Sequence, residues 1–514
     1  MHDSVCSDEQ ASIRHIGIMD IGSNSARYMI AKLYANRTFH MLDQGKETIR
    51  LGAGYDEEGS IPNQKVDELL SVIHRFKQLG ENYQRCEWIA VTTAAMRKAA
   101  NSEYIVRRIY EETGITVQMI SGDSEAYLDY VAVLSTVDVQ DAVIMDMGGG
   151  STEFIWMENR QFKESISLPV GALTIAEDYE VENALTADTE TYLRSMTRYW
   201  LRHVHWLKEA QGLPLVAIGG TLRTLAKMDI DEREYGVDSL HHYEFMPEEV
   251  EDWHQRIKGM DLEEKQALPG LSKDRAAILT GSLTFINECL LRFDSSKVMV
   301  SAKGVREGVL FDMLRGEGIH IDHPLKFSIY HLQHRLGLNR IQADRLWQLT
   351  NALMQELQPI LGWEEEWKRI VYAAAQLHDI GVSVSHMERE RHTFYMIRHA
   401  ELYGLTPRQI ALSALVATMD FKHKVPREWA EVEAILQPRD QTMAAKMGLI
   451  MRLALDLTRT YGCQTAEDVS CTVKDGEIIL MLQGAAAHMS WRGTDMYALR
   501  AGFRRWLKRE LKLS

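Results

Sequence analysis

The sequence predicts an α/β protein built from two duplicated halves, followed by an all-α region and a small α+β module at the C-terminal end. Three observations carry this prediction. In the first half of the chain, short β-rich runs alternate with glycine signals and helical segments, which is typical of α/β domains. One eight-residue pattern occurs twice, at residues 18–25 and 144–151. From about Leu325 onward glycine becomes rare and long amphipathic segments dominate, such as a helix expected over residues 341–361, which indicates a helical domain.

Length and charge narrow the class of protein. The chain has 514 residues, with 58 Lys and Arg against 73 Asp and Glu, and a formal net charge of -15. At roughly 100–200 residues per domain, this length predicts three or four domains. The negative charge argues against a nucleic-acid-binding protein, because such proteins usually carry a strong basic excess. A polyanionic substrate stays compatible with it, since a local basic channel attracts anions even in an acidic protein.

Cysteine usage and hydropathy indicate the compartment. The five cysteines form no CxxC pair and show no metal-ligand spacing, which is typical of a reducing compartment. The first twelve residues are polar, and no apolar run approaches the ~18 residues of a membrane span. We therefore expect a cytoplasmic protein with no integral membrane association.

The repeated pattern I-M-D-x-G-x-x-S predicts two equivalent β-hairpins. In each copy a buried strand ends at an aspartate, Asp20 or Asp146, and a Gly/Ser turn leads into a second strand. Successive N–H groups in such a turn form an anion-binding concavity, and glycine lets a phosphate approach closely. The aspartates are suited to hold a hard divalent cation through oxygen. Plain hairpin turns are the alternative, but two matched copies favour a pair of phosphate-binding turns.

A third glycine signal lies at residues 215–221, where a strand runs into a helix through Gly219, Gly220 and Thr221. The N-terminus of a helix attracts anions, although a Gly-Gly turn at this place often serves close packing alone. The glycines at positions 52, 54 and 59 do not fit GxGxxG, so no dinucleotide fingerprint is expected.

Six motifs occur in one order between about residues 15 and 315. They are DIGSNS at 20–25, TTAAMRKAAN at 92–101, ISGDSEA at 120–126, DMGGGSTE at 146–153, GGT at 219–221 and GVREG at 304–308. Together they resemble the exopolyphosphatase/guanosine pentaphosphate phosphohydrolase family, most of all a bacterial exopolyphosphatase. The ordered set is specific, whereas a single motif is not.

The resemblance implies two ribonuclease-H-like lobes of the actin, Hsp70 and sugar-kinase superfamily, which close on a phosphoanhydride. The implied reaction is Mg²⁺-dependent removal of the terminal phosphate from linear polyphosphate, or of the 5′ γ-phosphate from guanosine pentaphosphate. A monovalent cation such as K⁺ is a further candidate cofactor, and a homodimer is expected. The alternatives from other classes are an ATP-dependent kinase of the same superfamily and a non-catalytic sensor of nucleotide or polyphosphate.

The resemblance also assigns roles to individual residues. Glu125 matches the catalytic base, and Glu153 matches a second carboxylate that positions water or metal. Asp20 and Asp146, together with Glu153, match the family residues that hold the metal ion. Arg97 matches an arginine that contacts substrate phosphate. The other residues expected to bind substrate phosphates are Gly22, Ser23, Asn24, Ser25, Gly148, Gly149, Gly150, Ser151, Thr152, Gly220 and Thr221.

These residue types suit phosphoryl transfer to water. A carboxylate such as Glu125 orients and deprotonates the attacking water, while a cation and N–H donors take up charge on the transferring oxygens. Arg97 is able to grip phosphate bidentately, which a lysine at Lys98 does less well. The alternatives are purely structural roles: a carboxylate that stabilises the start of a helix for Glu125, and a surface ion pair for Arg97. The sequence is equally compatible with two roles for Arg306 and Glu307: an ion pair at an inter-domain hinge, or part of the active site. Lys303 is a candidate phosphate contact.

The helical region contains His378-Asp379 after an apolar helix, which looks like the core of an HD-type phosphohydrolase domain. The ligand pattern is incomplete: Asp344 and its neighbours offer no leading histidine, and Leu455 stands where the final aspartate is expected. We therefore predict an HD-like fold whose metal site is lost, with a working second active site as the alternative.

The expected domains are residues 1–132, 133–320, 321–460 and 461–514, with the change to helical texture near His323-Pro324. The last module should hold a hairpin over residues 469–482, turning at Asp475-Gly476, and a basic helix from about Asp495. Six basic residues follow from position 500 onward, and they form either a polyphosphate channel lining or a solvated helix face.

Overall fold

The structure, a computed structural model, describes residues 13–513 except for residues 37, 84, 180, 237–238, 420–426, 461, 475 and 484–493. The chain divides into two compact units. The first unit contains Met1–Glu232 and Leu240–Pro324, and the second contains Arg233–Ser239 and Leu325–Ser514. The main boundary therefore falls at Pro324, where the sequence changes to helical texture.

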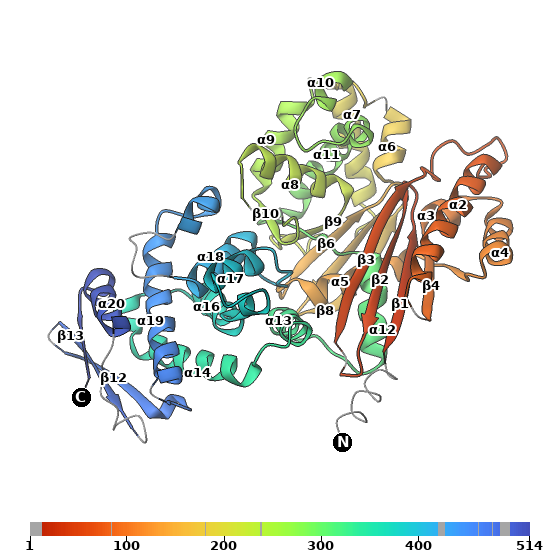
Figure 1. Cartoon of the computed structure of the whole chain (residues 1–514). Coiled ribbons are helices and arrows are strands. Elements are labelled where there is room, and N and C mark those ends of the chain that lie inside the picture. The colour runs from red at the N-terminus through yellow and green to blue at the C-terminus, as the bar shows by residue number, and fades with distance from the viewer. Residues whose placement is uncertain are drawn as a thin grey trace. The chain divides into compact units, whose positions relative to one another are not determined.

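The first lobe of the first unit is a five-stranded mixed sheet in the order β3-β2-β1-β4-β5 (Figure 1). Its strands are β1 (Arg14–Ile21), β2 (Ser25–Leu33), β3 (Phe39–Thr48), β4 (Cys86–Thr92) and β5 (Val117–Met119). Its helices are α2 (Asn63–Glu81), α3 (Ala94–Lys98) and α4 (Ser102–Thr113). The apolar residues of α2 at positions 66, 69, 70, 73 and 76 recur at helical spacing and are all buried in the core of this lobe.

The second lobe is a six-stranded mixed sheet in the order β10-β11-β9-β6-β7-β8 (Figure 1). Its strands are β6 (Ala142–Met147), β7 (Thr152–Glu158), β8 (Gln161–Leu168), β9 (Leu215–Gly219), β10 (Tyr243–Phe245) and β11 (Val298–Val300). Its helices are α6 (Ala172–Tyr179), α7 (Ala187–Leu201), α8 (Gly220–Glu232), α9 (Pro247–Ile257), α10 (Leu262–Gln266) and α11 (Lys273–Phe293).

The two lobes repeat one topology, which confirms the predicted duplication. In the first lobe β1, β2 and β3 are antiparallel neighbours, and β4 and β5 add to β1 as parallel strands. In the second lobe β6, β7 and β8 are antiparallel neighbours, and β9 and β11 add to β6 as parallel strands. Both predicted hairpins, β1–β2 and β6–β7, are present, so their Gly/Ser turns lie at equivalent places.

Two helices join the lobes. Helix α5 (Gly122–Thr136) follows the first sheet but packs on β6, β7 and β8, whereas α12 (Val305–Gly316) follows the second sheet and packs on β1. The two helices also pack on each other, closely enough that a Cβ atom on Gly308 would lie 2.1 Å from the carbonyl oxygen of Leu128. Because α5 continues across residue 132, the expected boundary at that position falls inside a helix.

The second unit is mainly helical. Its helices are α13 (Pro324–Arg335), α14 (Arg340–Glu356), α15 (Gln358–Leu361), α16 (Glu365–Leu377), α17 (Arg389–Arg398), α18 (Pro407–Ala417), α19 (Asp440–Thr460) and α20 (Thr494–Gly502). The strands β12 (Val469–Lys474), β13 (Glu477–Leu482) and β14 (Glu510–Leu513) form a small sheet that shares one hydrophobic core with the helices.

In the second unit, one expected helix differs from the prediction and the expected hairpin is confirmed. The single helix expected over residues 341–361 is two helices, because the first helix ends at its cap residue, Leu357. Pro359 lacks the N–H that a continuous helix would need at this point. The expected hairpin is confirmed as β12–β13, although Asp475 of its predicted turn lies outside the described residues.

Among the helices that the structure describes, α11 has the length and hydropathy of a membrane span. Of its apolar window, 83% is buried, and the helix packs against α6, α7 and α9. This burial is that of a core helix in a folded domain.

Candidate active site

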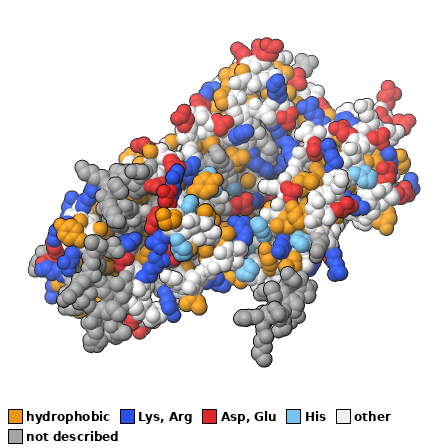
Figure 2. Space-filling model, viewed as in Figure 1, with side chains coloured by type: hydrophobic (Ala, Val, Ile, Leu, Met, Phe, Trp, Pro, Cys, Tyr) orange, Lys and Arg blue, Asp and Glu red, His pale blue; other side chains and the backbone are white. Residues whose placement is uncertain are grey.

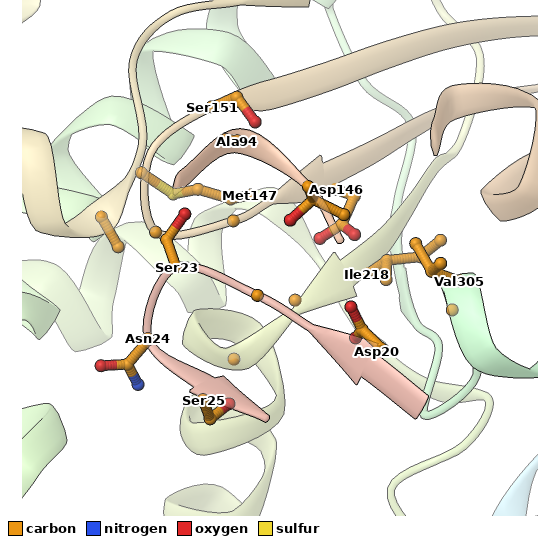
Figure 3. A pocket seen from close by; sticks show the side chains of 18 of the residues that line it. Asp20, Ser23, Asn24, Ser25, Ala94, Asp146, Met147, Ser151, Ile218 and Val305 are labelled. Atoms are coloured by element: carbon orange, nitrogen blue, oxygen red, sulfur yellow. The ribbon is translucent and has the colours of Figure 1, made fainter. Parts of the chain in front are cut away.

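The two Gly/Ser turns line one pocket in the first unit (Figure 3). Equivalent hydrogen bonds close the turns, from the Gly22 N–H to the Ser25 carbonyl at 3.1 Å and from the Gly148 N–H to the Ser151 carbonyl at 3.0 Å. The turns are close together, since a Cβ atom on Gly149 would lie 3.1 Å from the Cβ of Ser23. The predicted residues that line this pocket are Asp20, Gly22, Ser23, Asn24, Ser25, Glu125, Asp146, Gly148, Gly149, Gly150, Ser151 and Gly220.

The strand-to-helix turn after β9 serves both packing and the pocket. Gly219 has a φ of +100° and approaches β6 so closely that a Cβ atom would lie 2.6 Å from the carbonyl oxygen of Met147. Gly220 begins α8 and lines the pocket, whereas Thr221 is buried behind it. Close packing therefore explains the glycine at position 219, and both Gly219 and Gly220 line the pocket.

The two repeated aspartates lie at equivalent strand ends and both line the pocket (Figure 3). Burial raises the pKa of Asp20, while the charges of Arg27 and Arg306 oppose the rise. Burial likewise raises the pKa of Asp146, against the charge of Arg223. Both carboxylates therefore sit in an environment where a bound cation would favour their charged form.

Glu125 stands in the first turn of α5, and its side chain faces the pocket. The Ser121 hydroxyl begins this helix by accepting a hydrogen bond from the Ser124 N–H at 3.1 Å. The Arg97 guanidinium donates to the Glu125 carboxylate at 2.8 Å. Burial first, and the charge of Glu153 second, raise the pKa of Glu125 well above its usual value. A carboxylate with a raised pKa is a better proton acceptor, so this environment suits a general base.

Two further carboxyl groups lie behind the pocket wall. Glu153 is fully buried and accepts a hydrogen bond from the Ser167 hydroxyl at 2.7 Å, and burial and the charge of Asp146 raise its pKa to about 7. Asp129, one helical turn after Glu125, is also fully buried, and burial and Asp146 raise its pKa well above the usual value. Sequence reasoning missed Asp129, although the four-residue spacing from Glu125 on a helix was a usable signal.

These carboxylates fit a hard cation such as Mg²⁺. Within the described residues, both oxygens of Asp129 and one oxygen of Glu153 are buried without a hydrogen-bond partner, and a nearby cation would favour the charged forms of these groups. No three His, Cys, Asp or Glu side chains in the described ranges are close enough together to hold a metal ion unaided. Mg²⁺ is usually held by one or two carboxylates with water and substrate phosphates. Asp20 and Asp146, which face the pocket, are the residues that would hold it.

Three predicted phosphate contacts do not line the pocket. Arg97 instead joins the Ile120 carbonyl at 2.9 Å to Glu125, which places it beside the expected base. Thr152 is buried and donates to the Val170 carbonyl at 2.6 Å, and Thr221 is buried as well. A motif specifies which residue type is present but not which atom that residue faces.

Sequence reasoning missed most of the positive charge. Four arginines line the pocket, and they come from β2, α8, α11 and α12: Arg27, Arg223, Arg275 and Arg306. Burial and the charge of Arg27 lower the pKa of Arg223 to about 10, which leaves it charged at neutral pH. Figure 2 shows Lys and Arg side chains gathering in the hollow between the two lobes. The acidic chain thus contains the local basic region that its net charge conceals.

Arg306 and Glu307 serve structure and site together. The Arg306 guanidinium donates to the Tyr28 carbonyl at 2.9 Å and thereby ties α12 to β2 of the other lobe. The Glu307 carboxylate accepts from the Gly304 N–H at 3.0 Å and lies 3.6 Å from Arg306. Both residues also line the pocket, so this pair joins α12 to β2 of the first lobe and contributes to the site.

In the second unit, arginines surround the aspartate of the HD dipeptide. The His378 Nδ1 bonds the Ala375 carbonyl at 2.9 Å, and its Nε2 lies 3.2 Å from Asp379. Arg459 bonds Asp379, and Arg389 lies 3.9 Å from it. Burial raises the pKa of Asp379, but hydrogen bonds from His378 and Arg459 outweigh this and hold it below its usual range. Within the described residues, the Asp379 carboxylate is therefore paired with guanidinium groups.

Arg459→Met is expected to destabilise the second unit by about 1 kcal/mol, because a half-buried hydrogen bond to a charged group is lost. Thermal unfolding with and without EDTA measures this, and chelation is expected to leave the midpoint of the second unit unchanged. Arg391→Met is the matched control, since Arg391 forms an exposed pair with Glu388 at 3.5 Å. A fall of the midpoint on chelation would instead indicate a working metal site.

The basic residues at the C-terminal end are partly neutralised. Arg504 bonds Glu510 through its Nε at 2.8 Å, and Lys512 pairs with Glu477. Two of the six basic residues therefore have a carboxylate partner within the described part of this region.

Comparison with known proteins follows the same division of the chain. Residues 29–317 match the Ppx/GppA phosphatase family, and residues 326–490 match domain III of Ppx/GppA phosphatases. The crystal structure of the Aquifex aeolicus family member is 24% identical, with a TM-score of 0.53, over 60% of this chain and 100% of that chain. A Cytophaga hutchinsonii exopolyphosphatase is also 24% identical, with a TM-score of 0.56 and the same coverage.

At this identity the solved structures show the fold of the part that they cover, 60% of this chain, which holds the two mixed sheets of the actin-like lobes. The helical region and the small sheet that follow correspond to the match with domain III. The predicted fold class is therefore confirmed. The family match covers more than half of the chain and contains five of the six ordered motifs in full. The chain therefore belongs to the Ppx/GppA phosphatase family, as the order of its motifs predicts.

Proposed function

We propose that this chain is a Mg²⁺-dependent exopolyphosphatase, which releases orthophosphate from the end of linear inorganic polyphosphate. The observation that carries the proposal is the convergence of Glu125, two Gly/Ser turns and four arginines on one pocket. A guanidinium group binds one phosphate bidentately, so four of them suit several phosphates in a row. The name exopolyphosphatase of the Cytophaga hutchinsonii structure supports the same assignment.

In this proposal different groups of the chain bind the substrate and activate the water. The N–H groups of the two turns bind oxygens of the terminal phosphate, and the pocket arginines hold the phosphates that follow. Glu125 orients a water molecule and takes one of its protons as the water oxygen bonds to the terminal phosphorus. The bridging P–O bond breaks, and the shortened polyphosphate leaves as an oxyanion. A Mg²⁺ ion at Asp20 and Asp146 would supply charge that neutralises the phosphate oxygens.

Arg97 is then a positioning residue. Its hydrogen bonds to the Ile120 carbonyl and to Glu125 fix the direction of the carboxylate. Its charge also limits the rise in the pKa of Glu125, so that the group remains able to ionise. This contact differs from the direct phosphate contact that the family resemblance implies.

The test is a comparison of substrates. We expect kcat/KM for phosphate release from long polyphosphate to exceed that for guanosine pentaphosphate, and both activities to require Mg²⁺. A large preference for guanosine pentaphosphate would make the chain a 5′-phosphohydrolase that uses the same pocket. Phosphate transfer from ATP to an acceptor other than water would indicate a kinase, and binding of polyphosphate without phosphate release would indicate a sensor.

A further inference from the structure

The carbonyl groups of the first turn are fixed from within the first lobe. The Ser23 carbonyl accepts from the Gly52 N–H at 2.8 Å, and the Asn24 carbonyl accepts from the N–H groups of Ile49 and Arg50 at 3.1 and 2.9 Å. A trans peptide is planar, so its C=O and the N–H of the next residue point in opposite directions. Fixing these carbonyls therefore also fixes the directions of the N–H groups that follow them.

The second turn is fixed in the same way, with one exception. The Gly148 and Gly149 carbonyls accept from the N–H groups of Ala172 and Leu173, both at 2.9 Å, within the second lobe. The Gly150 carbonyl is the counterpart of the Asn24 carbonyl, but its donor is the Lys98 ammonium at 3.0 Å. Lys98 is the last residue of α3, in the first lobe. The last peptide of the second turn thus depends on a side chain from the opposite lobe.

This peptide is the one most able to turn. Gly150 follows another glycine and has no side chain, so rotation of the Gly150–Ser151 peptide costs little in backbone energy. Ser151 lines the pocket. With the Gly150 carbonyl held by Lys98, the Ser151 N–H is fixed in direction. With the carbonyl released, the peptide is able to present its oxygen to an anion, which repels it.

The surroundings of Lys98 are formed by both lobes. Its side chain is exposed, and a Cβ atom on Gly150 would lie 3.8 Å from the Lys98 ammonium and 3.3 Å from the Ser23 hydroxyl. The charges of Glu177 and Asp178 on α6 act on the ammonium. The second lobe therefore offers a carbonyl oxygen and two carboxylates to one lysine of the first lobe.

We propose that Lys98 is a positioning residue that, from the first lobe, completes the second phosphate-binding turn. This inference rests on the proposed function, because it gives the turn a terminal phosphoanhydride phosphate to bind. Without the Lys98 ammonium the turn would lack one fixed N–H donor, so a side chain of the first lobe contributes to transition-state stabilisation at a turn of the second lobe. N–H donors aimed at developing charge act mainly on kcat, because they stabilise the transition state more than the bound substrate.

The test compares Lys98→Met with Lys77→Met. Lys77 is the matched control, since its ammonium also donates to a backbone carbonyl, that of Thr113 at 2.9 Å, but within the first lobe. We expect Lys98→Met to lower kcat on polyphosphate by about 10- to 100-fold with a smaller change in KM, and Lys77→Met to leave both unchanged. The thermal midpoints of both variants show whether the fold is intact.

A second readout does not depend on turnover. Methylenediphosphonate, a non-hydrolysable diphosphate analogue, is expected to protect the amides of residues 148–152 from hydrogen exchange in the wild type and in Lys77→Met. This protection should be reduced in Lys98→Met. If the wild type neither binds the analogue nor releases phosphate, the proposed function fails. If it does both, and Lys98→Met matches Lys77→Met in kcat and in protection, the positioning role of Lys98 is wrong.

Discussion

Glu125→Gln is expected to lower kcat for phosphate release from long polyphosphate by about 10²- to 10⁴-fold, the range that a positioned general base contributes. Glutamine keeps the shape of the side chain and its place beside Arg97, 2.8 Å from the present carboxylate, but cannot accept a proton from water. The measurement is steady-state phosphate release at saturating Mg²⁺. KM should change little, because Glu125 contributes to the reacting water rather than to the polyphosphate chain.

The pH profile gives a second readout of the same residue. Burial and the charge of Glu153 raise the pKa of Glu125, and only the ionised form acts as a base. Activity of the wild type should therefore rise with pH, and this rise should lie above the range of an ordinary glutamate. Glu125→Gln should remove the rise.

The matched control is Glu111→Gln, on the exposed face of α4, where Glu111 pairs with Arg107 at 3.9 Å. This variant should retain the wild-type kcat and pH profile. If Glu125→Gln folds normally and still turns over at the wild-type rate, another group must activate the water, and the assignment of the base is wrong.

The sequence predicted those parts of the site that are local in the chain. The two turns were recognisable because a strand, an aspartate, a Gly/Ser turn and a second strand follow one another within residues 14–33 and again within residues 142–158. Glu125 was recognised through the resemblance of its motif, residues 120–126, to the family's, and it stands in the first turn of a helix that Ser121 caps. In such segments the backbone conformation follows from neighbouring residues, so the pattern specifies the geometry.

The remainder of the site depends on contacts between distant segments. Arg27, Arg223 and Arg275 lie on three elements that only the folded lobes bring together, and no short motif marks them. Arg97 was recognised by type, yet its partner is Glu125 rather than the open pocket. Leu357 shows the same limit in the second unit, because an apolar helical pattern continues across a backbone break there.

Asp146→Asn is expected to lower kcat/KM for polyphosphate by about 10²-fold or more, because a cation at a transferring phosphate is worth several kcal/mol. The substituted asparagine would keep the shape of the side chain but lose the charge that faces the pocket. The Mg²⁺ concentration for half-maximal activity should rise, and the stabilisation of the fold by Mg²⁺ in thermal unfolding should shrink. The second measurement needs no turnover, so it separates loss of cation binding from loss of chemistry.

Asp188→Asn, at the first turn of α7, is the control for this substitution, since Asp188 lies away from the pocket and should affect neither measurement. Asp20→Asn should resemble Asp146→Asn, because the two aspartates end equivalent strands and both face the pocket. An unchanged Mg²⁺ dependence in Asp146→Asn would contradict a cation at these strand ends. The unpartnered oxygens of Asp129 and Glu153 would then be the remaining candidates, because buried carboxylates left without a cation or a donor are costly.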